Sequence, residues 1–309
     1  MARPAHEPLQ GGMMNRILGK RQLSADVFRM EIEAPLIARE RKAGQFVIMQ
    51  IDVEWGERIP LTIADADEAK GSVSIIFQTV GATTHRLAEL AVGDSVAAVL
   101  GPLGNPTHIE NFGRAVCVGG GIGVAPMHPI AQALKKAGNH LTIIMGARNK
   151  ELLILEDEMR ALADELIVLT DDGSYGRKAL VTEPLKELCQ SADKPDIVVA
   201  IGPPIMMKFC AETTRPFGVK TLASLNTIMI DGTGMCGGCR VAVDGKTRFV
   251  CVDGPEFDAH LVDWDGMMRR LRAYKGIEDQ RHQAHHDHEC RLDAAADKLA
   301  AGQSAGGAK

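Results

Sequence analysis

Residues 118–126, Val-Gly-Gly-Gly-Ile-Gly-Val-Ala-Pro, are the stretch that decides the fold. They follow an apolar run typical of a strand and open a periodic run typical of a helix. Glycines let the backbone turn tightly and approach a phosphate, and the amino end of a helix adds favourable partial positive charge. Pro126 suits the first helical turn, where its missing N–H costs nothing. From Gly121 the spacing is G-x-G-x-x-P, so the motif alone also fits an unliganded strand–helix turn.

The remainder of residues 111–225 places this motif at the head of a repeating β–α pattern. Short apolar runs predict strands at 115–118, 141–145, 166–169, 196–201 and 219–223. Helical patterns lie between them, at 125–137, 155–164, 178–189 and 204–213. Continuous apolar strands that alternate with helices are typical of a parallel α/β sheet. This context favours a Rossmann-like nucleotide-binding domain over a merely tight turn.

Loops after the other predicted strands supply further candidate nucleotide contacts, because ligands bind beyond the carboxyl ends of parallel strands. Asp171 or Asp172 could hydrogen-bond a ribose diol, and their charge would repel a 2′-phosphate, which favours NAD(H) over NADP(H). Arg148, in the preceding loop, tempers that preference because it is basic. An ordinary Asp/Gly turn is the alternative interpretation of residues 170–176. The candidate set in this domain is Gly120, Gly121, Gly123, Pro126, Gly146, Arg148, Asp171, Asp172, Gly202, Pro203 and Met206.

Residues 13–110 predict a β domain that precedes the α/β domain. Short β-branched segments such as 45–51, 72–79 and 95–100 are separated by turns, a pattern typical of a closed barrel or a sandwich. Arg58 offers a planar fork of donors for a pyrophosphate, and Thr62 offers a short hydroxyl that could reach a flavin edge. Taken alone, each of these motifs is more typical of a β-turn. The candidate residues are Arg58, Pro60, Leu61, Thr62, Gln78, Val80, Gly81 and Thr84.

The sharpest motif is a cysteine loop within residues 226–265. Asp231, Cys236, Cys239 and Cys251 have the spacing D-x4-C-x2-C…C, whereas plant-type [2Fe–2S] proteins use C-x4-C-x2-C…C. Asp231 stands where the first thiolate would be expected, and a carboxylate can bind ferric iron, so these four residues are the predicted iron ligands. Glycines let the loop wrap a cluster and point amides at its sulfurs. A zinc site of three thiolates with an outside ligand, or unliganded thiols, are the alternatives.

Composition excludes several classes of function. The chain has 309 residues, enough for two domains and a small third. Its net charge of −5 and 4% aromatic residues disfavour a nucleic-acid binder. The amino terminus lacks the apolar segment of a signal peptide, and glycines and prolines interrupt the uncharged run at 115–134, so we expect no membrane insertion. Seven unevenly placed cysteines favour the reducing cytoplasm over a disulfide framework.

Residues 266–309 predict a helix followed by a disordered tail. The tail contains His282, His285, His286, His288 and Cys290. Such a tract is a candidate metal-binding segment, with adventitious metal binding as the alternative.

The order of these motifs resembles that of the ferredoxin–NADP reductase superfamily over about residues 13–265. Within it, the chain is similar to the branch that holds the electron-transfer subunit of B-type dihydroorotate dehydrogenase and the small subunit of NADH-dependent ferredoxin:NADP oxidoreductase. The motifs that carry the resemblance are R-x-P-L-T, V-G-x-T-T-x-x-L, G-P-L-G-N, G-G-G-I-G-V-A-P, D-D-G-S, G-P-P-x-M and the cysteine loop. The resemblance implies a β-barrel that holds FAD, a Rossmann-like domain for NAD(H) and a small [2Fe–2S] subdomain.

The resemblance also implies roles for matched residues. Arg58, Thr62, Gly81 and Thr84 should contact FAD; Gly121, Gly123 and Pro126 should line the NAD pyrophosphate; Asp172 should meet the adenosine ribose; and Cys236, Cys239 and Cys251 should hold the cluster. An aspartate at position 231 is a feature of the ferredoxin:NADP branch, whereas the dihydroorotate branch has a fourth cysteine there. Two departures are Thr83, in place of a glycine, and Ile201, where many reductases carry a cysteine.

These observations predict a cytoplasmic electron-transfer flavoprotein subunit. NADH would deliver two electrons to FAD, and the cluster would accept them one at a time, so no acid or base residue is required. We expect a larger flavin and iron–sulfur subunit as the partner, through which ferredoxin is a candidate acceptor. The alternatives are the electron-transfer subunit of B-type dihydroorotate dehydrogenase and a zinc-stabilised nucleotide-binding module without a redox role.

Overall fold

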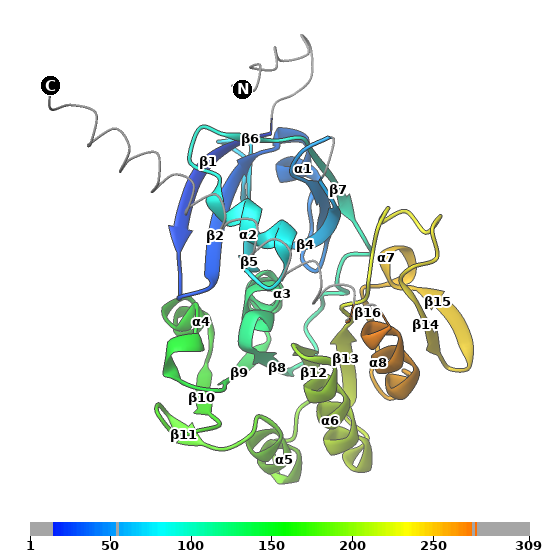
Figure 1. Ribbon diagram of the computed structural model, residues 1–309. Helices are drawn as coiled ribbons and strands as arrows, with labels where there is room; N and C mark the ends of the chain where they lie inside the picture. Colours follow the sequence, from blue (N-terminus) through cyan, green and yellow to red (C-terminus); the bar gives the residue numbers. More distant parts are fainter. Residues whose placement is uncertain (1–14, 54–55, 274–275, 277–309) are drawn as a thin grey trace, which may run out of the picture.

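The computed structural model describes residues 15–53, 56–273 and 276. In Figure 1 the antiparallel strands lie above the parallel sheet, and the segment from β14 to α8 lies beside both. The predicted histidine tract, including His282, His285, His286, His288 and Cys290, lies outside the described residues. No helix in the described part of the chain is both long and apolar enough to cross a bilayer.

Residues 15–103, at the amino-terminal end of the described chain, form the predicted barrel. Seven strands pair antiparallel in the order β6-β1-β2-β5-β4-β3-β7. The edge strands β6 and β7 are separated only by Ala97, so the sheet nearly closes on itself. Ile17, Val47, Ile63 and Phe77 are among the buried side chains that fill its interior. The elements are β1 (Asn15–Gln22), β2 (Val27–Glu33), α1 (Pro35–Glu40), β3 (Phe46–Gln50), β4 (Arg58–Asp67), β5 (Ser72–Gln78), α2 (Ala82–Glu89), β6 (Ser95–Val96) and β7 (Ala98–Leu103).

The second sheet is the predicted parallel sheet. Its strand order is β11-β10-β9-β8-β12-β13-β16, and all pairs are parallel except β13 with β16. The inner strand β12 is buried along its whole length, as expected for a sheet covered on both faces. The elements are β8 (Arg114–Gly120), η1 (Gly121–Gly123), α3 (Val124–Lys136), β9 (His140–Ala147), η2 (Lys150–Leu152), α4 (Glu156–Leu162), β10 (Glu165–Thr170), β11 (Arg177–Lys178), α5 (Thr182–Gln190), β12 (Ile197–Ile201), α6 (Pro204–Thr214), η3 (Arg215–Phe217) and β13 (Lys220–Ser224).

The order of these strands fixes where a ligand can bind. The chain enters the sheet at β8, moves to β9 and β10 on one side, and then returns to β12 and β13 on the other. The order therefore reverses between β8 and β12, and open α/β sheets bind ligands at such a switch point. The glycine motif follows β8, and Gly202 and Pro203 follow β12, so both predicted loops lie at this point.

The segment that contains the cysteine loop includes regular secondary structure. It contains a hairpin of β14 (Arg240–Val243) and β15 (Lys246–Phe249), followed by α7 (Val250–Asp253), β16 (Glu256–Asp258) and α8 (Trp264–Arg272). Strand β16 joins the larger sheet by pairing with β13. The helix expected after residue 266 is present as α8. The division into units 13–110, 111–225, 226–265 and 266–309 stays a prediction.

Three local expectations were wrong. The β-turn alternative for residues 57–62 fails because Arg58 begins the ten-residue strand β4, which pairs with β3. The segment expected as one strand at 95–100 is two strands, since the chain turns at Ala97 to reach the opposite edge of the sheet. The helix expected from residue 178 begins at Thr182, because Arg177 and Lys178 pair with β10 as β11.

Candidate functional site

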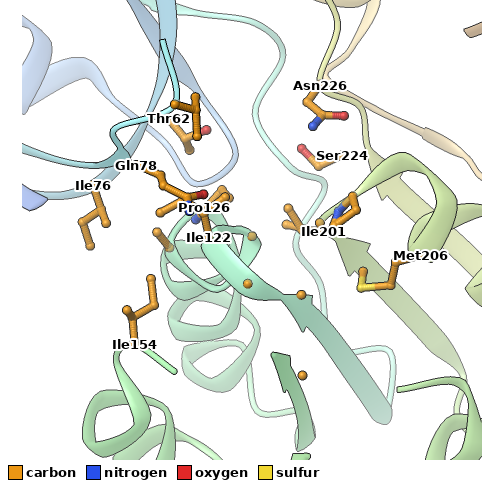
Figure 2. A pocket seen from close by; sticks show the side chains of 18 of the residues that line it. Thr62, Ile76, Gln78, Ile122, Pro126, Ile154, Ile201, Met206, Ser224 and Asn226 are labelled. Carbon is orange, nitrogen blue, oxygen red and sulfur yellow. The ribbon is translucent and has the colours of Figure 1, made fainter. Parts of the chain in front are cut away.

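A cavity of about 1100 Å³ lies between the barrel and the carboxyl end of the parallel sheet. In Figure 2, Thr62 and Gln78 on the barrel side face Ile201, Ser224 and Asn226 on the sheet side. Sixteen of the nineteen predicted cofactor residues line it: Pro60, Leu61, Thr62, Gln78, Val80, Thr84, Gly120, Gly121, Gly123, Pro126, Gly146, Arg148, Asp171, Gly202, Pro203 and Met206. Residues from separate motifs, more than 140 positions apart, thus share one cavity.

Three predicted residues do not line the cavity. Arg58 is exposed at the first position of β4. Gly81 caps α2, where its N–H donates to the Thr84 hydroxyl at 3.1 Å. The Asp172 carboxylate accepts a hydrogen bond from the Ser174 N–H at 2.9 Å, and bonding to Ser174 lowers the pKa of Asp172. Asp171, its neighbour, is the aspartate that lines the cavity.

The glycines at the switch point permit close contact between backbone segments. A Cβ on Gly123 would lie 2.3 Å from the carbonyl oxygen of Ile201 and 2.7 Å from Cα of Gly202. Gly121 differs: it has φ +54° and nothing lies within 4 Å of an added Cβ. Gly123 is therefore required for packing between the β8 and β12 loops, whereas Gly121 leaves room for a ligand in front of α3.

The cavity has a wall that the sequence analysis missed. Ser224, Asn226, Thr227 and Met229 line it from the segment that leads from β13 to the cysteine loop, and Pro255 lies near them in the lining. Isolated polar residues in an irregular segment give no sequence signal. The Thr227 hydroxyl oxygen is buried and, among the described residues, has no hydrogen-bond partner. Such a group costs about 1–3 kcal/mol of stability.

The cysteine loop brings its predicted ligands to one end of the molecule. The Asp231 carboxylate accepts hydrogen bonds from the Thr233 N–H at 2.8 Å and the Cys236 N–H at 2.6 Å, and these bonds lower its pKa. Cys239 and Cys251 are buried with their sulfurs 3.2 Å apart, and Cys236 is exposed. Burial, together with this neighbouring thiol, raises the pKa of Cys251 to about 12.

These donors fit an iron–sulfur cluster. Metal–thiolate bonds of about 2.3 Å in a tetrahedron place two sulfurs on one ion roughly 3.8 Å apart. The sulfurs of Cys239 and Cys251 are 3.2 Å apart, so they would have to separate by roughly 0.6 Å to share one iron. The Gly238 N–H points at the Cys236 sulfur and the Cys251 N–H at the Cys239 sulfur, as expected around a cluster. Within the described residues, no three His, Cys, Asp or Glu side chains are grouped to hold a single metal ion. A two-iron cluster divides its ligands between two irons and needs no such group.

The three described cysteines outside the cysteine loop are all buried. Cys117, Cys189 and Cys210 are buried in the sheet and its helices. Burial raises the pKa of Cys117 and of Cys210 to about 12, so both remain protonated at neutral pH.

A carboxyl group lies where the three parts of the chain meet. Glu256 on β16 accepts a hydrogen bond of 2.7 Å from the hydroxyl of Thr107, which follows the barrel. A Cβ on Gly44 of the barrel would lie 3.0 Å from the same Glu256 oxygen. Loss of solvent raises the pKa of Glu256 to about 7, and the Thr107 hydrogen bond only partly opposes this rise.

Glu256 predicts a specific pH dependence of stability. Its pKa rises from 4.5 to about 7 on folding, so between these values the unfolded chain has lost a proton that the folded chain keeps. Stability should therefore fall as pH rises through this window. Glu256→Gln should match the wild type at about pH 5 and exceed it by about 1–2 kcal/mol at about pH 8. Thermal denaturation at both pH values measures this, with the exposed Glu151→Gln as control; unchanged pH dependence in Glu256→Gln would contradict it.

Comparisons with known proteins agree with this geometry. The family model for the iron–sulfur cluster binding domain of dihydroorotate dehydrogenase B matches residues 226–263, and that for the oxidoreductase NAD-binding domain matches residues 117–212. The dihydroorotate dehydrogenase B (NAD(+)) electron transfer subunit homolog of Thermotoga maritima is 49% identical over 86% of this chain and 93% of its own length. The chain belongs to this family of electron-transfer subunits.

Other relatives place the chain within the family. The electron transfer subunit of dihydroorotate dehydrogenase B from Streptococcus mutans is 33% identical over 81% of this chain and 97% of its own length. A solved chain of an NADH-dependent reduced ferredoxin–NADP oxidoreductase, studied for flavin-based electron bifurcation, is 47% identical, with a TM-score of 0.81 over 88% of this chain and 99% of that one. The cytochrome b5 reductase domain of an Ulva prolifera nitrate reductase, 19% identical with a TM-score of 0.55, shares the fold.

The family and the fold establish the general chemistry. The chain is an oxidoreductase electron-transfer subunit with an FAD-binding barrel, an NAD-binding domain and an iron–sulfur domain. The match at 226–263 supports the cluster interpretation of the cysteine loop over the zinc alternative.

Proposed function

We propose that the chain passes electrons between NAD(H), FAD and a [2Fe–2S] cluster and on to a larger flavin and iron–sulfur subunit, as in NADH-dependent ferredoxin:NADP oxidoreductase. One observation carries this proposal: the cavity that joins the flavin motifs to the nucleotide loops has a wall that continues into the cysteine loop. A hydride donor, a flavin and a one-electron centre would thus lie in sequence along one path.

The barrel side of the cavity fits FAD. Thr62 and Gln78 offer a hydroxyl and an amide to the polar edge of a flavin ring, and both point into the cavity in Figure 2. Pro60, Leu61 and Val80 add apolar surface for the ring, and the Thr84 hydroxyl orders the backbone of the 80–81 turn. The contact between Arg58 and the FAD pyrophosphate stays a prediction.

The sheet side fits NAD(H). The amides at Gly121 and Gly123 and the amino end of the thirteen-residue helix α3 would bind its pyrophosphate. Gly146, Arg148 and Asp171 surround the position for the adenosine half, and Gly202, Pro203 and Met206 that for the nicotinamide half. The residues Ile122, Ile154 and Ile201 are apolar and exclude water from the space between the two cofactors.

FAD, when bound, converts the two-electron chemistry of NADH into single electrons that a cluster accepts. The chain's task is positioning: the barrel orients the flavin, α3 and its neighbouring loops orient the nicotinamide, and Asp231, Cys236, Cys239 and Cys251 hold the iron. The carboxylate at position 231 favours the ferredoxin:NADP type of complex. The electron-transfer subunit of dihydroorotate dehydrogenase B remains the second candidate, because several relatives carry that name. Both candidates need a partner subunit, through which ferredoxin would react in the first, and both fit a cytoplasmic protein.

Anaerobic purification of the full chain tests the proposal. We expect FAD with about two iron atoms and two sulfides per chain, and a visible spectrum that NADH bleaches. Turnover with a physiological acceptor should require the co-purified partner, whose identity separates the two candidates. Material free of iron and inorganic sulfide, or full turnover by the chain alone, would overturn the proposal.

The two adjacent aspartates predict a test of nucleotide choice. Asp171→Ala should raise the KM for NADH about tenfold and reduce the preference for NADH over NADPH. Both effects arise because the variant loses a charged hydrogen bond to the ribose and the repulsion of a 2′-phosphate. Asp172→Ala should weaken both dinucleotides alike, since it only loosens the turn at Ser174. Steady-state kinetics with NADH and NADPH measure this. An NADH-specific loss in Asp172→Ala with a neutral Asp171→Ala would reverse the assignment.

A further inference from the structure

We propose that Arg240 and Arg270 position the turn between Cys236 and Cys239 so that its amides face the cluster, and that their charges stabilise the reduced cluster. The two arginines would thereby raise the midpoint potential of the iron–sulfur centre. The inference rests on the proposed function, because it assumes that the cysteine loop holds a cluster. It assigns a positioning and electrostatic role to two side chains that lie outside the ligand set.

The carbonyls of the turn are the first observation. Arg240, which begins β14, donates from Nη1 to the carbonyl oxygen of Gly237 at 3.0 Å. Arg270 on α8 donates from Nη2 to the carbonyl oxygen of Gly238 at 3.1 Å. Both residues between the two cysteine ligands thus present their carbonyl to a guanidinium, a group that stays charged at neutral pH.

Peptide geometry links these carbonyls to the sulfur ligands. In a planar trans peptide the C=O and N–H bonds point in opposite directions, so the partner of the carbonyl fixes where the amide points. The peptide between the two glycines has both ends engaged: Arg240 binds its oxygen, and its nitrogen lies 3.4 Å from the Cys236 sulfur, with the N–H pointing at it. The next peptide has its oxygen on Arg270, which turns the Cys239 N–H away from that guanidinium.

Helix α8 brings Arg270 to the turn from a later part of the chain. In Figure 1 this helix lies beside β14, and the two elements pack together. Met267, three residues before Arg270 and on the same side of the helix, is buried. Arg270 itself is half-buried. Its contact with the turn therefore depends on the docking of α8 and is held in place by it.

The charges of both arginines are available to the cluster. Neither Arg240 nor Arg270 forms an ion pair with a carboxylate in the part of the chain that the structure describes. Arg248 on β15, in contrast, lies 3.9 Å from Asp253. A [2Fe–2S] cluster with four anionic ligands is negatively charged, and its reduction adds a further electron. Nearby cations and amides that point at the sulfurs stabilise this added charge and raise the potential.

Matched variants of α8 test the inference. Arg270→Gln removes the charge, Arg270→Lys keeps it, and Arg272→Gln removes an exposed charge on another face of the same helix. The full chain is purified anaerobically, and the cluster and flavin potentials are measured by redox titration with electron paramagnetic resonance and visible absorbance. We expect Arg270→Gln to lower the equilibrium constant for cluster reduction about tenfold, a fall of about 59 mV. Arg270→Lys and Arg272→Gln should stay within about threefold of the wild type, with the flavin potential unchanged in every variant.

Arg240→Gln tests the other carbonyl contact. It should lower the cluster potential as well, because the amide that points at the Cys236 sulfur loses the contact that orients it. Arg240 is exposed, so this variant is expected to fold and to keep the inference testable if Arg270→Gln does not.

Other results would overturn the inference. Cluster potentials in both glutamine variants that match the wild type would show that neither arginine acts on the cluster. An equal fall in Arg272→Gln would make the effect one of net charge, and loss of iron from Arg270→Lys as well as Arg270→Gln would leave Arg270 a purely structural role. Iron and sulfide contents that match the wild type show that a shifted potential belongs to an intact cluster. The proposed function is tested separately, because it fails only if the wild-type chain itself binds neither FAD nor a cluster.

Discussion

Replacing Cys239 with serine is expected to remove the iron–sulfur cluster and to lower electron delivery to the partner at least about 100-fold, while NADH still reduces the bound FAD. Cys239 is buried, and its sulfur lies 3.2 Å from that of Cys251, so one lost thiolate disrupts the pair. A serine hydroxyl is a poor ligand for iron at neutral pH. Apart from Cys236, which is exposed, and Cys251, which is buried, no other described cysteine lies in this loop to replace the lost thiolate. The barrel and the nucleotide loops are formed by other residues, so the flavin half-reaction should persist.

The cluster is measured by iron and sulfide analysis and by electron paramagnetic resonance of the reduced protein. The reduction of FAD by NADH is measured separately, by stopped-flow absorbance. Cys189→Ala is the matched control, because this thiol is also buried but lies on α5, away from the loop. It should keep the cluster and wild-type electron delivery. A Cys239→Ser protein with normal iron content, or loss of FAD reduction along with the cluster, would contradict the proposed path.

The sequence predicted the fold well where local patterns suffice. The parallel strands are apolar runs because both faces of their sheet are buried, so their positions could be read directly from the chain. The glycine motif at 118–126 is informative because it combines a backbone requirement with a position after a strand. The cysteine spacing predicted the iron–sulfur domain for a similar reason, since the ligand set and its loop are encoded within 21 positions.

Features that depend on distant parts of the chain could not be predicted. Lys178 was expected to begin a helix, but it pairs with β10 together with Arg177, so the helix begins only at Thr182. The break at Ala97 exists because β6 and β7 belong to opposite edges of the barrel. Residues 58–62 contain a proline, which suggests a turn, yet pairing with β3 makes them part of a strand.

The residues of the candidate site also include some that local sequence patterns predict and some that depend on distant parts of the chain. Sixteen predicted residues meet in one cavity because each lies on a strand, helix or loop whose position the fold dictates. Asp171 and Asp172 could not be told apart by sequence, since the choice depends on which carboxylate the Ser174 amide occupies. Ser224 and Asn226 were missed because they reach the cavity from an irregular segment, and only the fold brings that segment to the cavity.

Replacing Gly123 with alanine is expected to have the largest effect on the nucleotide domain. The added Cβ would lie 2.3 Å from the Ile201 carbonyl oxygen, and that strand end cannot retreat because β12 is buried and paired on both sides. Overpacking against backbone costs about 2–4 kcal/mol, which corresponds to a fall in Tm of about 5–10 °C. Because the loop after β8 would be displaced from the amino end of α3, the KM for NADH should also rise at least about tenfold.

Gly121→Ala is the control that separates packing from ligand binding. Its positive φ costs an alanine only about 1 kcal/mol, and nothing lies within 4 Å of the new methyl group. Its Tm should therefore fall by no more than about 4 °C, while its KM for NADH rises because the methyl group projects toward the proposed pyrophosphate position. Thermal denaturation without ligand and NADH kinetics compare the two variants. If Gly121→Ala lowered Tm as much as Gly123→Ala, or left the KM unchanged, the assignment of one glycine to packing and the other to the dinucleotide would be wrong.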